Sequence, residues 1–419
     1  MRVLLSEGSG LTSRQVATRL SAMGHQVGVV TSDRMCLARF TNCVHQLHDV
    51  PPYGAHPFGW LDAAVDVYRR HGYDLLFPTH EQVAVLSRSV DPLARAAVRT
   101  IVPTFPSLLA VQDKRSAYGT LSRLAIAQPA TTLIDSREQL AAWARFPVFM
   151  KTPIGTATSG VRLIRTADQL HELVDEWGVP TTFRDGGVLA QTPVDGPLAM
   201  VQSVADRGRL VAFHAALRIR EGARGGSSHK QSVALPQVRE WFVALCADLD
   251  WHGALSADVI LGPDGPMVID VNPRLVEPMN AWRAGVDLVG AMLEVAGPTR
   301  GRAGDPAPAG RDGVRTHQLL LAVLGAAQDG RGRRGVAREL GAAALSRGDY
   351  RDSAEELAPA RHDLRTLAPV VAASLSTFAR PSRWQSFSSG SVSTYAMGPD
   401  AWRQIRAGRD STAEPARAG

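Results

Sequence analysis

The sequence predicts an α/β protein, and three observations indicate this class. Short apolar segments alternate with helical patterns through the first hundred residues. Glycine, proline and small polar residues separate these segments. The chain has 419 residues, of which 45% are hydrophobic, enough for two or three domains with substantial cores. Alternating strands and helices predict a parallel sheet covered by helices.

Residues 1–110 are expected to form the first domain, which resembles a Rossmann fold. The predicted strands are Val3–Leu5, Val27–Val30 and Leu75–Phe77. The predicted helices are Ser13–Met23, Trp60–Arg70 and Glu81–Ser89. Gly8 and Gly10 follow the first strand, but Ser13 stands where a dinucleotide-binding motif has its third glycine, which disfavours a nicotinamide site.

Four further regions follow. Residues 111–186 are predicted to hold the helix Asp113–Leu124, the strands Val148–Lys151 and Val161–Ile164, and the helix Ala167–Trp177, capped by Thr166. Residues 187–298 are predicted to hold the strands Val188–Gln191, Ala199–Ala205 and Leu210–Leu217, the helix Pro236–Leu249, a hairpin, and the helix Ala281–Val295. Residues 299–405 form a mostly helical extension behind a linker at 299–313, and residues 406–419 a disordered tail.

Two aspartates are expected to meet in the hairpin. Residues 262–266, Gly-Pro-Asp-Gly-Pro, have strong turn chemistry between two apolar runs. If Leu261 pairs with Met267, Asp258 lies directly opposite Asp270, and Asn272 projects from the same face. Cβ atoms of opposed residues are about 5 Å apart, so two carboxylates there need a shared proton or a bridging cation. Two carboxylates and an amide oxygen suit Mg²⁺.

Lysine is rare in this chain, so each lysine needs an explanation. Of 46 basic residues only three are lysines: Lys114, Lys151 and Lys230. Lys151 ends an apolar strand before a loop of small residues (152–160), whose amides and hydroxyls could bind phosphate. Lys114 opens a helix. Together with the acid pair, Lys114 and Lys151 favour contact with a nucleotide over a solvated surface position.

Composition excludes several classes of protein. The formal charge of +6 is spread thinly, without a basic run interleaved with aromatics, so nucleic acid is not an expected partner. We find no apolar run long enough to span a membrane and no signal-peptide pattern at the N-terminus. Three scattered cysteines do not form a disulfide framework. The expected location is the cytoplasm.

These residues resemble the ATP-grasp superfamily over residues 1–298. The features that carry the resemblance occur in its order: Asp113-Lys114, the strand ending at Lys151, a linker strand near Val188–Val194, and Asp258 followed by Asp270-Val-Asn272-Pro-Arg274. The run from Arg218 to Ser228 is closer still to predicted ATP-dependent carboligases related to carbamoyl-phosphate synthase. The segment beginning at Gly313 is similar to the C-terminal extension of that subgroup.

The resemblance implies a role for each matching position. Lys114 and Lys151 would contact ATP, Arg274 would steady the transferring phosphate, and Lys151 would share that catalytic role. ATP would also be bound by the loop and by the linker strand: Gly155, Thr156, Thr158, Ser159, Gly160, Gln191, Thr192 and Val194. Asp258, Asp270 and Asn272 would hold Mg²⁺, with two ions expected and Mn²⁺ able to substitute. The acceptor substrate would be bound by Arg218, Arg220, Gly225, Gly226 and Ser227.

The expected reaction is that of a carboxylate–amine ligase. ATP would phosphorylate a substrate carboxylate, and an amine would attack the acyl phosphate to form an amide-like bond. The alternatives are an ATP-dependent kinase, a carbamoyl- or carboxyl-transfer enzyme, and a nucleotide-binding protein without catalysis. The partners are a small carboxylate and an amine, amino acids or a biosynthetic intermediate among them. His214, His229 and His252 are not expected to be catalytic.

Two features leave alternatives open. Arg218, Arg220, Arg224 and Lys230 make the acceptor loop basic, which indicates either an anionic acceptor or the general abundance of arginine. The helical extension either covers the site or forms the interface of a homodimer.

Overall fold

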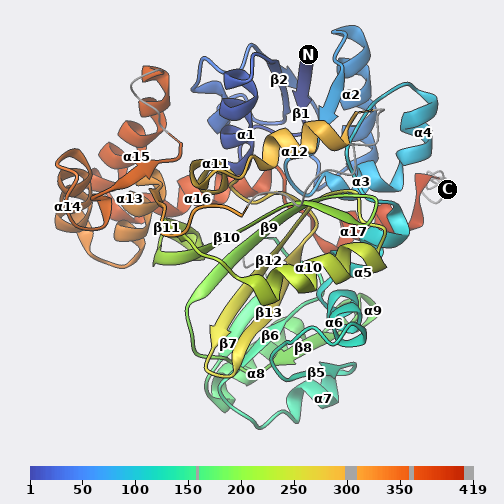
Figure 1. The fold of residues 1–419 in the computed structure, drawn as a ribbon. Coiled ribbons are helices and arrows are strands. Elements are labelled where there is room, and N and C mark those ends of the chain that lie inside the picture. The colour runs from blue at the N-terminus through green and yellow to red at the C-terminus, as the bar shows by residue number, and fades with distance from the viewer. Residues whose placement is uncertain (157–159, 298–308, 358–362, 410–419) are drawn as a thin grey trace, which may run out of the picture.

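The structure is a computed structural model that describes residues 1–156, 160–297, 309–357 and 363–409; the side chains of residues 388–391 are not described. An N-terminal α/β domain lies at the top of Figure 1, a long antiparallel sheet crosses the centre, and a small sheet lies at the bottom. The helices that carry most of the C-terminal extension form a group at the left of the same view.

The N-terminal domain contains the predicted parallel sheet. Its strands have the order β3-β2-β1-β4, with β1 Arg2–Leu5, β2 Gln26–Thr31, β3 Gln46–Asp49 and β4 Leu75–Phe77. Its helices are α1 Leu11–Ala22, α2 Pro57–Arg70, α3 Val83–Arg88, α4 Val90–Arg95 and α5 Phe105–Gln112. The polar strand β3 was not predicted. Because β1 has β2 on one side and β4 on the other, the strand order reverses there, and ligands of open α/β sheets bind at the carboxyl ends of such strands.

A second unit, the small subdomain, spans residues 114–191. It comprises α6 Lys114–Arg123, β5 Thr131–Ile134, α7 Arg137–Ala141, β6 Val148–Lys151, β7 Val161–Ile164, α8 Ala167–Trp177, α9 Pro180–Arg184 and β8 Val188–Gln191. The strands form an antiparallel sheet in the order β5-β8-β6-β7. Asp113 caps α6 by accepting the N–H of Ser116, and Thr166 caps α8 as predicted. Since β8 pairs with β5 and β6, this sheet includes a strand beyond the expected boundary at residue 186.

The central sheet has seven strands in the order β13-β12-β9-β10-β11-β14-β15. Its strands are β9 Leu198–Asp206, β10 Arg209–Glu221, β11 Ser227–Ser232, β12 Gly253–Gly262, β13 Gly265–Asn272, β14 Arg315–His317 and β15 Ser353–Glu355. The accompanying helices are α10 Pro236–Asp248, α11 Met279–Ala284 and α12 Leu288–Val295. The last two replace the single helix predicted over Ala281–Val295, because Gly285 leaves the helix with φ +99° and Asp287 caps α12.

The C-terminal extension is mostly helical, as expected, but β14 and β15 also lengthen the central sheet. Its helices are α13 Leu319–Gln328, α14 Gly332–Ala344, α15 Leu367–Ala379, α16 Trp384–Ser393 and α17 Pro399–Ala407. Helix α17 returns to the N-terminal domain, where Trp402 and Ile405 are buried in the core beside Trp60 and Leu61. It therefore runs to Ala407, past residue 406, where the tail was expected to begin; residues 410–419, like most of the 299–313 linker, lie outside the described residues.

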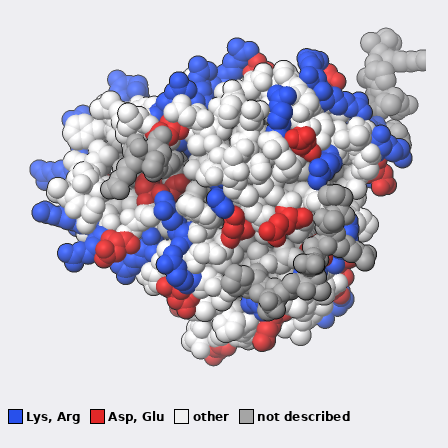
Figure 2. All heavy atoms as spheres, turned by 45° about the horizontal axis from the view of Figure 1, so that its top comes forward, with Lys and Arg blue, Asp and Glu red and all other residues white. Residues whose placement is uncertain are grey.

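Two general expectations about the surface can be compared with the structure. Among the described helices, none is both long and apolar enough to cross a bilayer. On the face shown in Figure 2, carboxylates lie between the lysine and arginine side chains. That face therefore presents both signs of charge.

Candidate active site

The two aspartates of the hairpin lie directly opposite each other. Asp258 of β12 pairs with Asp270 of β13, and Asn272 is two residues further along. The register at the turn differs from the prediction, since Met267 pairs with Ile260 and not with Leu261. A bulge between the Val268 and Asp270 pairs then shifts the register by one residue. The acid pair is thus aligned by a bulge, which an unbroken pairing could not have anticipated.

The acid pair carries unfavourable charge. Desolvation and then the negative charge of Asp270 raise the pKa of Asp258 to about 7, although Arg218 and Arg274 oppose the shift. Lys114 Nζ lies 3.8 Å from Asp270 Oδ1. A cation placed between the carboxylates would relieve the remaining repulsion.

Lys151 connects the small subdomain to this hairpin. Its Nζ donates to Gln191 Oε1 at 2.6 Å and to the carbonyl oxygen of Ile269, the bulged residue, at 2.9 Å. Desolvation lowers the pKa of Lys151 to about 8, against the attraction of Asp270. Its side chain therefore already points from one sheet toward the acids of the other.

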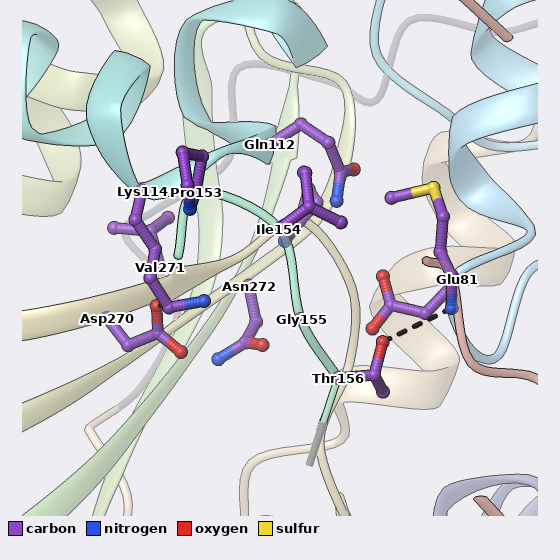
Figure 3. A pocket seen from close by; sticks show the side chains of 12 residues that line it. Glu81, Gln112, Lys114, Pro153, Ile154, Gly155, Thr156, Asp270, Val271 and Asn272 are labelled. Atoms are coloured by element: carbon purple, nitrogen blue, oxygen red, sulfur yellow. Dashed lines mark hydrogen bonds and ion pairs between the residues drawn. The ribbon is translucent and has the colours of Figure 1, made fainter. Parts of the chain in front are cut away.

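A polar crevice lies between the N-terminal domain, the small subdomain and the hairpin. Its cavity volume is about 30 Å³. In Figure 3, Lys114 and Asp270 lie on one side, Glu81 and Thr156 on the other, and Asn272 between them. The crevice is lined by Glu81, Gln112, Lys114, Pro153, Ile154, Gly155, Thr156, Asp270, Val271, Asn272, Pro273 and Met397. The crevice thus brings together three ATP-contact candidates, Lys114, Gly155 and Thr156, with the metal-ligand candidates Asp270 and Asn272.

The remaining nucleotide candidates are more dispersed. Gly160 has φ +79° and its carbonyl accepts the N–H of Thr152, which closes the base of the loop. Thr158 and Ser159 lie outside the described residues. The N–H of Thr192 donates to the carbonyl of Ala130, and Val194 lies beside Gly262 at the tip of the hairpin. Neither Thr192 nor Val194 lines the crevice.

Arg274 is held by the N-terminal domain. Its Nε lies 3.2 Å from Glu81 Oε1, and its carbonyl accepts the Ser256 hydroxyl. Glu81 follows β4, at the carboxyl end of the sheet where the strand order reverses. The sequence analysis missed Glu81 as a site residue; its position just after a buried strand was the available signal. Met397 was also missed, and no local pattern marks it.

The five acceptor candidates differ in their distance from the acid pair: Arg218 and Gly225 lie near Asp258, whereas Arg220 faces the C-terminal extension. Arg218 Nη1 donates to the carbonyl of Gly225 at 2.9 Å, so Arg218 and the glycine loop form one unit close enough to Asp258 to act on its charge. Ser227 Oγ lies 3.3 Å from Met200 Sδ, and Gly226 is in contact distance of Leu321. Arg220 points elsewhere, pairing with Glu339 at 2.6 Å and with Asp349 at 3.2 Å in the extension.

Lys230 is likewise part of the interior. Its Nζ lies 2.7 Å from Glu356 and also pairs with Glu277, and the residue is 2% exposed. Desolvation favours the neutral amine, but the two carboxylates outweigh it and raise the pKa of Lys230. Arg220 and Lys230 therefore have structural partners that account for their charges.

No group of three or more histidine, cysteine or acidic side chains in the described ranges could hold a metal ion by itself. The hairpin nevertheless fits magnesium, because Mg²⁺ is commonly held by one or two carboxylates together with the phosphates of a nucleotide. Asp258, Asp270 and the Asn272 amide offer oxygen atoms of the required kind.

The parallel N-terminal domain, the small antiparallel sheet and the central sheet with paired acids together form an ATP-grasp fold. Residues 111–278 match the ATP-grasp domain family, and the chain therefore carries an ATP-grasp domain. The chain is 23% identical over 323 residues to pyruvate carboxylase of Schizosaccharomyces pombe, a match that covers 70% of this chain and 27% of that protein. The chain thus spans about a quarter of this relative's length.

Solved structures have the same fold at low sequence identity. The biotin carboxylase domain of Hydrogenobacter thermophilus 2-oxoglutarate carboxylase, solved with MgADP and bicarbonate, has a TM-score of 0.59 at 16% identity and covers 75% of this chain and 73% of that one. Biotin carboxylase from Campylobacter jejuni has a TM-score of 0.57 at 16% identity, with 72% of each chain covered. An L-amino acid ligase from Bacillus licheniformis has a TM-score of 0.53 at 14% identity, covering 70% and 73%.

Proposed function

We propose that this protein is an ATP- and Mg²⁺-dependent ligase that activates a carboxylate as an acyl phosphate for attack by an amine. The observation that carries the proposal is the opposed pair Asp258 and Asp270, with Lys114 3.8 Å from the second carboxylate. Such a site supplies positioning and charge neutralisation, the two contributions that phosphoryl transfer needs from a protein.

Each side chain has a role in this reaction. Lys114 and Lys151 bind phosphate oxygens, and Lys151 exchanges its contacts with Gln191 and Ile269 for the nucleotide. Arg274, oriented by Glu81, faces the transferring phosphoryl group. Asp258, Asp270 and Asn272 would hold Mg²⁺, which when bound offsets the phosphate charge.

The carboxylate oxygen then attacks the γ-phosphorus, and the bond between this phosphorus and the β–γ bridging oxygen breaks to release ADP. The amine subsequently displaces phosphate from the acyl carbon, and the proton lost by the amine passes to solvent. Arg218, tied to the Gly225 carbonyl and close to Asp258, supports an acceptor position beside the acids. In this proposal Arg220 is not a substrate residue, because Glu339 and Asp349 occupy it.

The test is release of ADP from MgATP by the purified chain, with pooled carboxylates and amines. Activity is expected only with both substrates. Asp270→Asn should reduce turnover by at least 100-fold, whereas Asp264→Asn at the exposed tip of the same hairpin should retain it. Full turnover by Asp270→Asn would reject the metal site.

A carboxyl-transfer reaction is the second candidate, because pyruvate carboxylase and biotin carboxylases are among the similar proteins. The same assay distinguishes it. Stimulation of ADP release by bicarbonate without an amine would favour carboxyl transfer, and a stable phosphorylated product would indicate a kinase.

A further inference from the structure

A short segment of the C-terminal extension, Tyr395–Met397, passes the crevice, which Met397 lines. It joins α16 to α17, and α17 is anchored in the core of the N-terminal domain. The chain therefore leaves the helical extension, passes the carboxyl ends of β1 and β4, and becomes buried again. Both ends of the segment are fixed by packed helices.

Met397 contacts the candidate phosphate loop. Its backbone N–H donates to Thr156 Oγ1 at 3.3 Å, and it lines the crevice together with Lys114, Asp270 and Asn272. Met397 is 3% exposed, and its sulfur lies 3.8 Å from the hydroxyl of Tyr53. Residues more than 120 positions beyond the hairpin thus form part of the same wall.

Tyr395 is oriented by His80. The two rings are stacked, with centroids 4.1 Å apart and planes inclined by 22°. His80 is itself 4% exposed and follows β4, one residue before Glu81. Because Glu81 holds Arg274, the tyrosine and the arginine are positioned by consecutive residues of one loop.

The surroundings of the phenol favour a neutral hydroxyl. Desolvation raises the pKa of Tyr395, and the charges of Glu7, Glu81 and Glu277 add to this effect against the opposing charge of Arg274. Within the described residues, the Tyr395 hydroxyl has no hydrogen-bond partner. The charge of Arg274 acts on this phenol, so the hydroxyl is a donor in the neighbourhood of the guanidinium proposed to face the transferring phosphoryl group.

We infer that Tyr395 is a substrate-contact residue whose hydroxyl donates a hydrogen bond to the substrate carboxylate beside Arg274, with Met397 closing the adjacent wall. This inference rests on the proposed ligase reaction and adds a residue from outside the matched domain. Tyr395 keeps its proton throughout, while the carboxylate oxygen bonds to the γ-phosphorus and ADP departs.

The first test needs no turnover. Amide hydrogen exchange is measured on the full chain with and without Mg²⁺ and the ATP analogue AMP-PNP. The peptide containing Met397 should exchange at least threefold more slowly with the nucleotide, together with peptides covering residues 148–156. Protection of residues 148–156 without any change at Met397 would overturn the inference and leave the proposed function intact. Absence of protection at both places would reject the nucleotide site and the inference with it.

The second test separates contact from packing. Tyr395→Phe preserves the ring stacked on His80 and should raise the KM for the carboxylate about tenfold while leaving the KM for ATP within twofold. Tyr73→Phe is the matched control, because Tyr73 precedes β4 at the opposite end of the strand and bonds to His48. Equal effects of Tyr395→Phe on both KM values, or none on either, would overturn the inference. Tyr395→Ala, checked for folding by thermal melting, should in addition admit bulkier carboxylates.

Discussion

Two charge clusters in the central sheet differ in whether their charges are balanced. At the hairpin, Asp258 and Asp270 face each other and the pKa of Asp258 is raised to about 7. At β11, Lys230 lies between Glu277 and Glu356, and its own pKa is raised by these partners. In the first cluster the nearest paired cation, Lys114, lies 3.8 Å from Asp270 and leaves the pKa of Asp258 raised, whereas in the second Lys230 pairs directly with both carboxylates. Unbalanced charge is therefore the feature that distinguishes the candidate site from a structural ion pair of similar composition.

The largest expected effect tests this contrast directly. Lys230→Met should lower the free energy of unfolding by about 3–5 kcal/mol, because it leaves two buried carboxylates without a partner. Lys151→Met should change stability much less but abolish nucleotide binding. Chemical denaturation and calorimetric titration with AMP-PNP measure the two quantities. If both variants lost stability and neither lost nucleotide binding, both clusters would be structural, and the contrast would be wrong.

A pH dependence extends the comparison to a neutral buried group. Desolvation lowers the pKa of His214 to about 4, although its hydrogen bond to Asn280 opposes the shift. Above pH 6.5 the histidine is neutral in both folded and unfolded chains, so stability is unaffected. Between pH 6.5 and 4 the histidine is protonated in the unfolded chain but still neutral in the folded chain. As the pH is lowered through this range, the free energy of unfolding therefore decreases by up to about 3 kcal/mol. His214→Gln should flatten this part of the curve of melting temperature against pH; an unchanged slope would contradict the assignment.

Arg218 and Arg220 provide a smaller contrast within one strand. Arg220→Ala should destabilise the extension by about 2 kcal/mol, because Glu339 loses its charged partner. Arg218→Ala should instead raise the acceptor KM with little change in melting temperature. Limited proteolysis of the extension and steady-state kinetics distinguish these outcomes. A raised acceptor KM for Arg220→Ala without destabilisation would instead indicate that Arg220 binds the substrate.

The smallest effect on activity concerns assembly. A homodimer is still a proposal, and the face of α15 supports it: Val371, Leu375 and Phe378 are 51%, 67% and 46% exposed on a helix without charged residues. We expect Leu375→Asn to convert a dimer to a monomer, as measured by light scattering, with turnover unchanged. A wild-type chain that is monomeric at micromolar concentration would exclude this interface.

Local patterns made much of the fold predictable. The strands Val148–Lys151 and Val161–Ile164 and the helix capped by Thr166 occur as predicted, because apolar spacing and capping chemistry are encoded within a few residues. The polar strand β3 and the break at Gly285 were missed, since their structure depends on neighbouring strands and on one backbone angle. The ATP-grasp fold itself was predicted from the resemblance of a few motifs to that superfamily, and the match of residues 111–278 to the ATP-grasp domain family agrees with it.

The candidate site was predictable only in part, for the same reason. Asp258, Asp270 and Lys114 come together because turn chemistry and strand alternation act over short distances. Glu81 and Met397 reach the crevice from domains that are distant in sequence, and only tertiary packing brings them there. Lys230 looked like a residue of a basic acceptor loop in the sequence. Its structural role could not be predicted, because its partner Glu356 lies 126 positions away.

The bulged residue Ile269 gives the hairpin a second role. Its carbonyl accepts a hydrogen bond from Lys151, so this ammonium group is one link between the small sheet and the central sheet, beside the contact of Lys114 with Asp270. If Lys151 turns toward phosphate, that link is released at the moment the ligand arrives. Nucleotide binding would then break the hydrogen bond between Lys151 and Ile269 while forming new contacts between Lys151 and phosphate. The position of the small sheet relative to the hairpin would thus depend on the conformation of the Lys151 side chain.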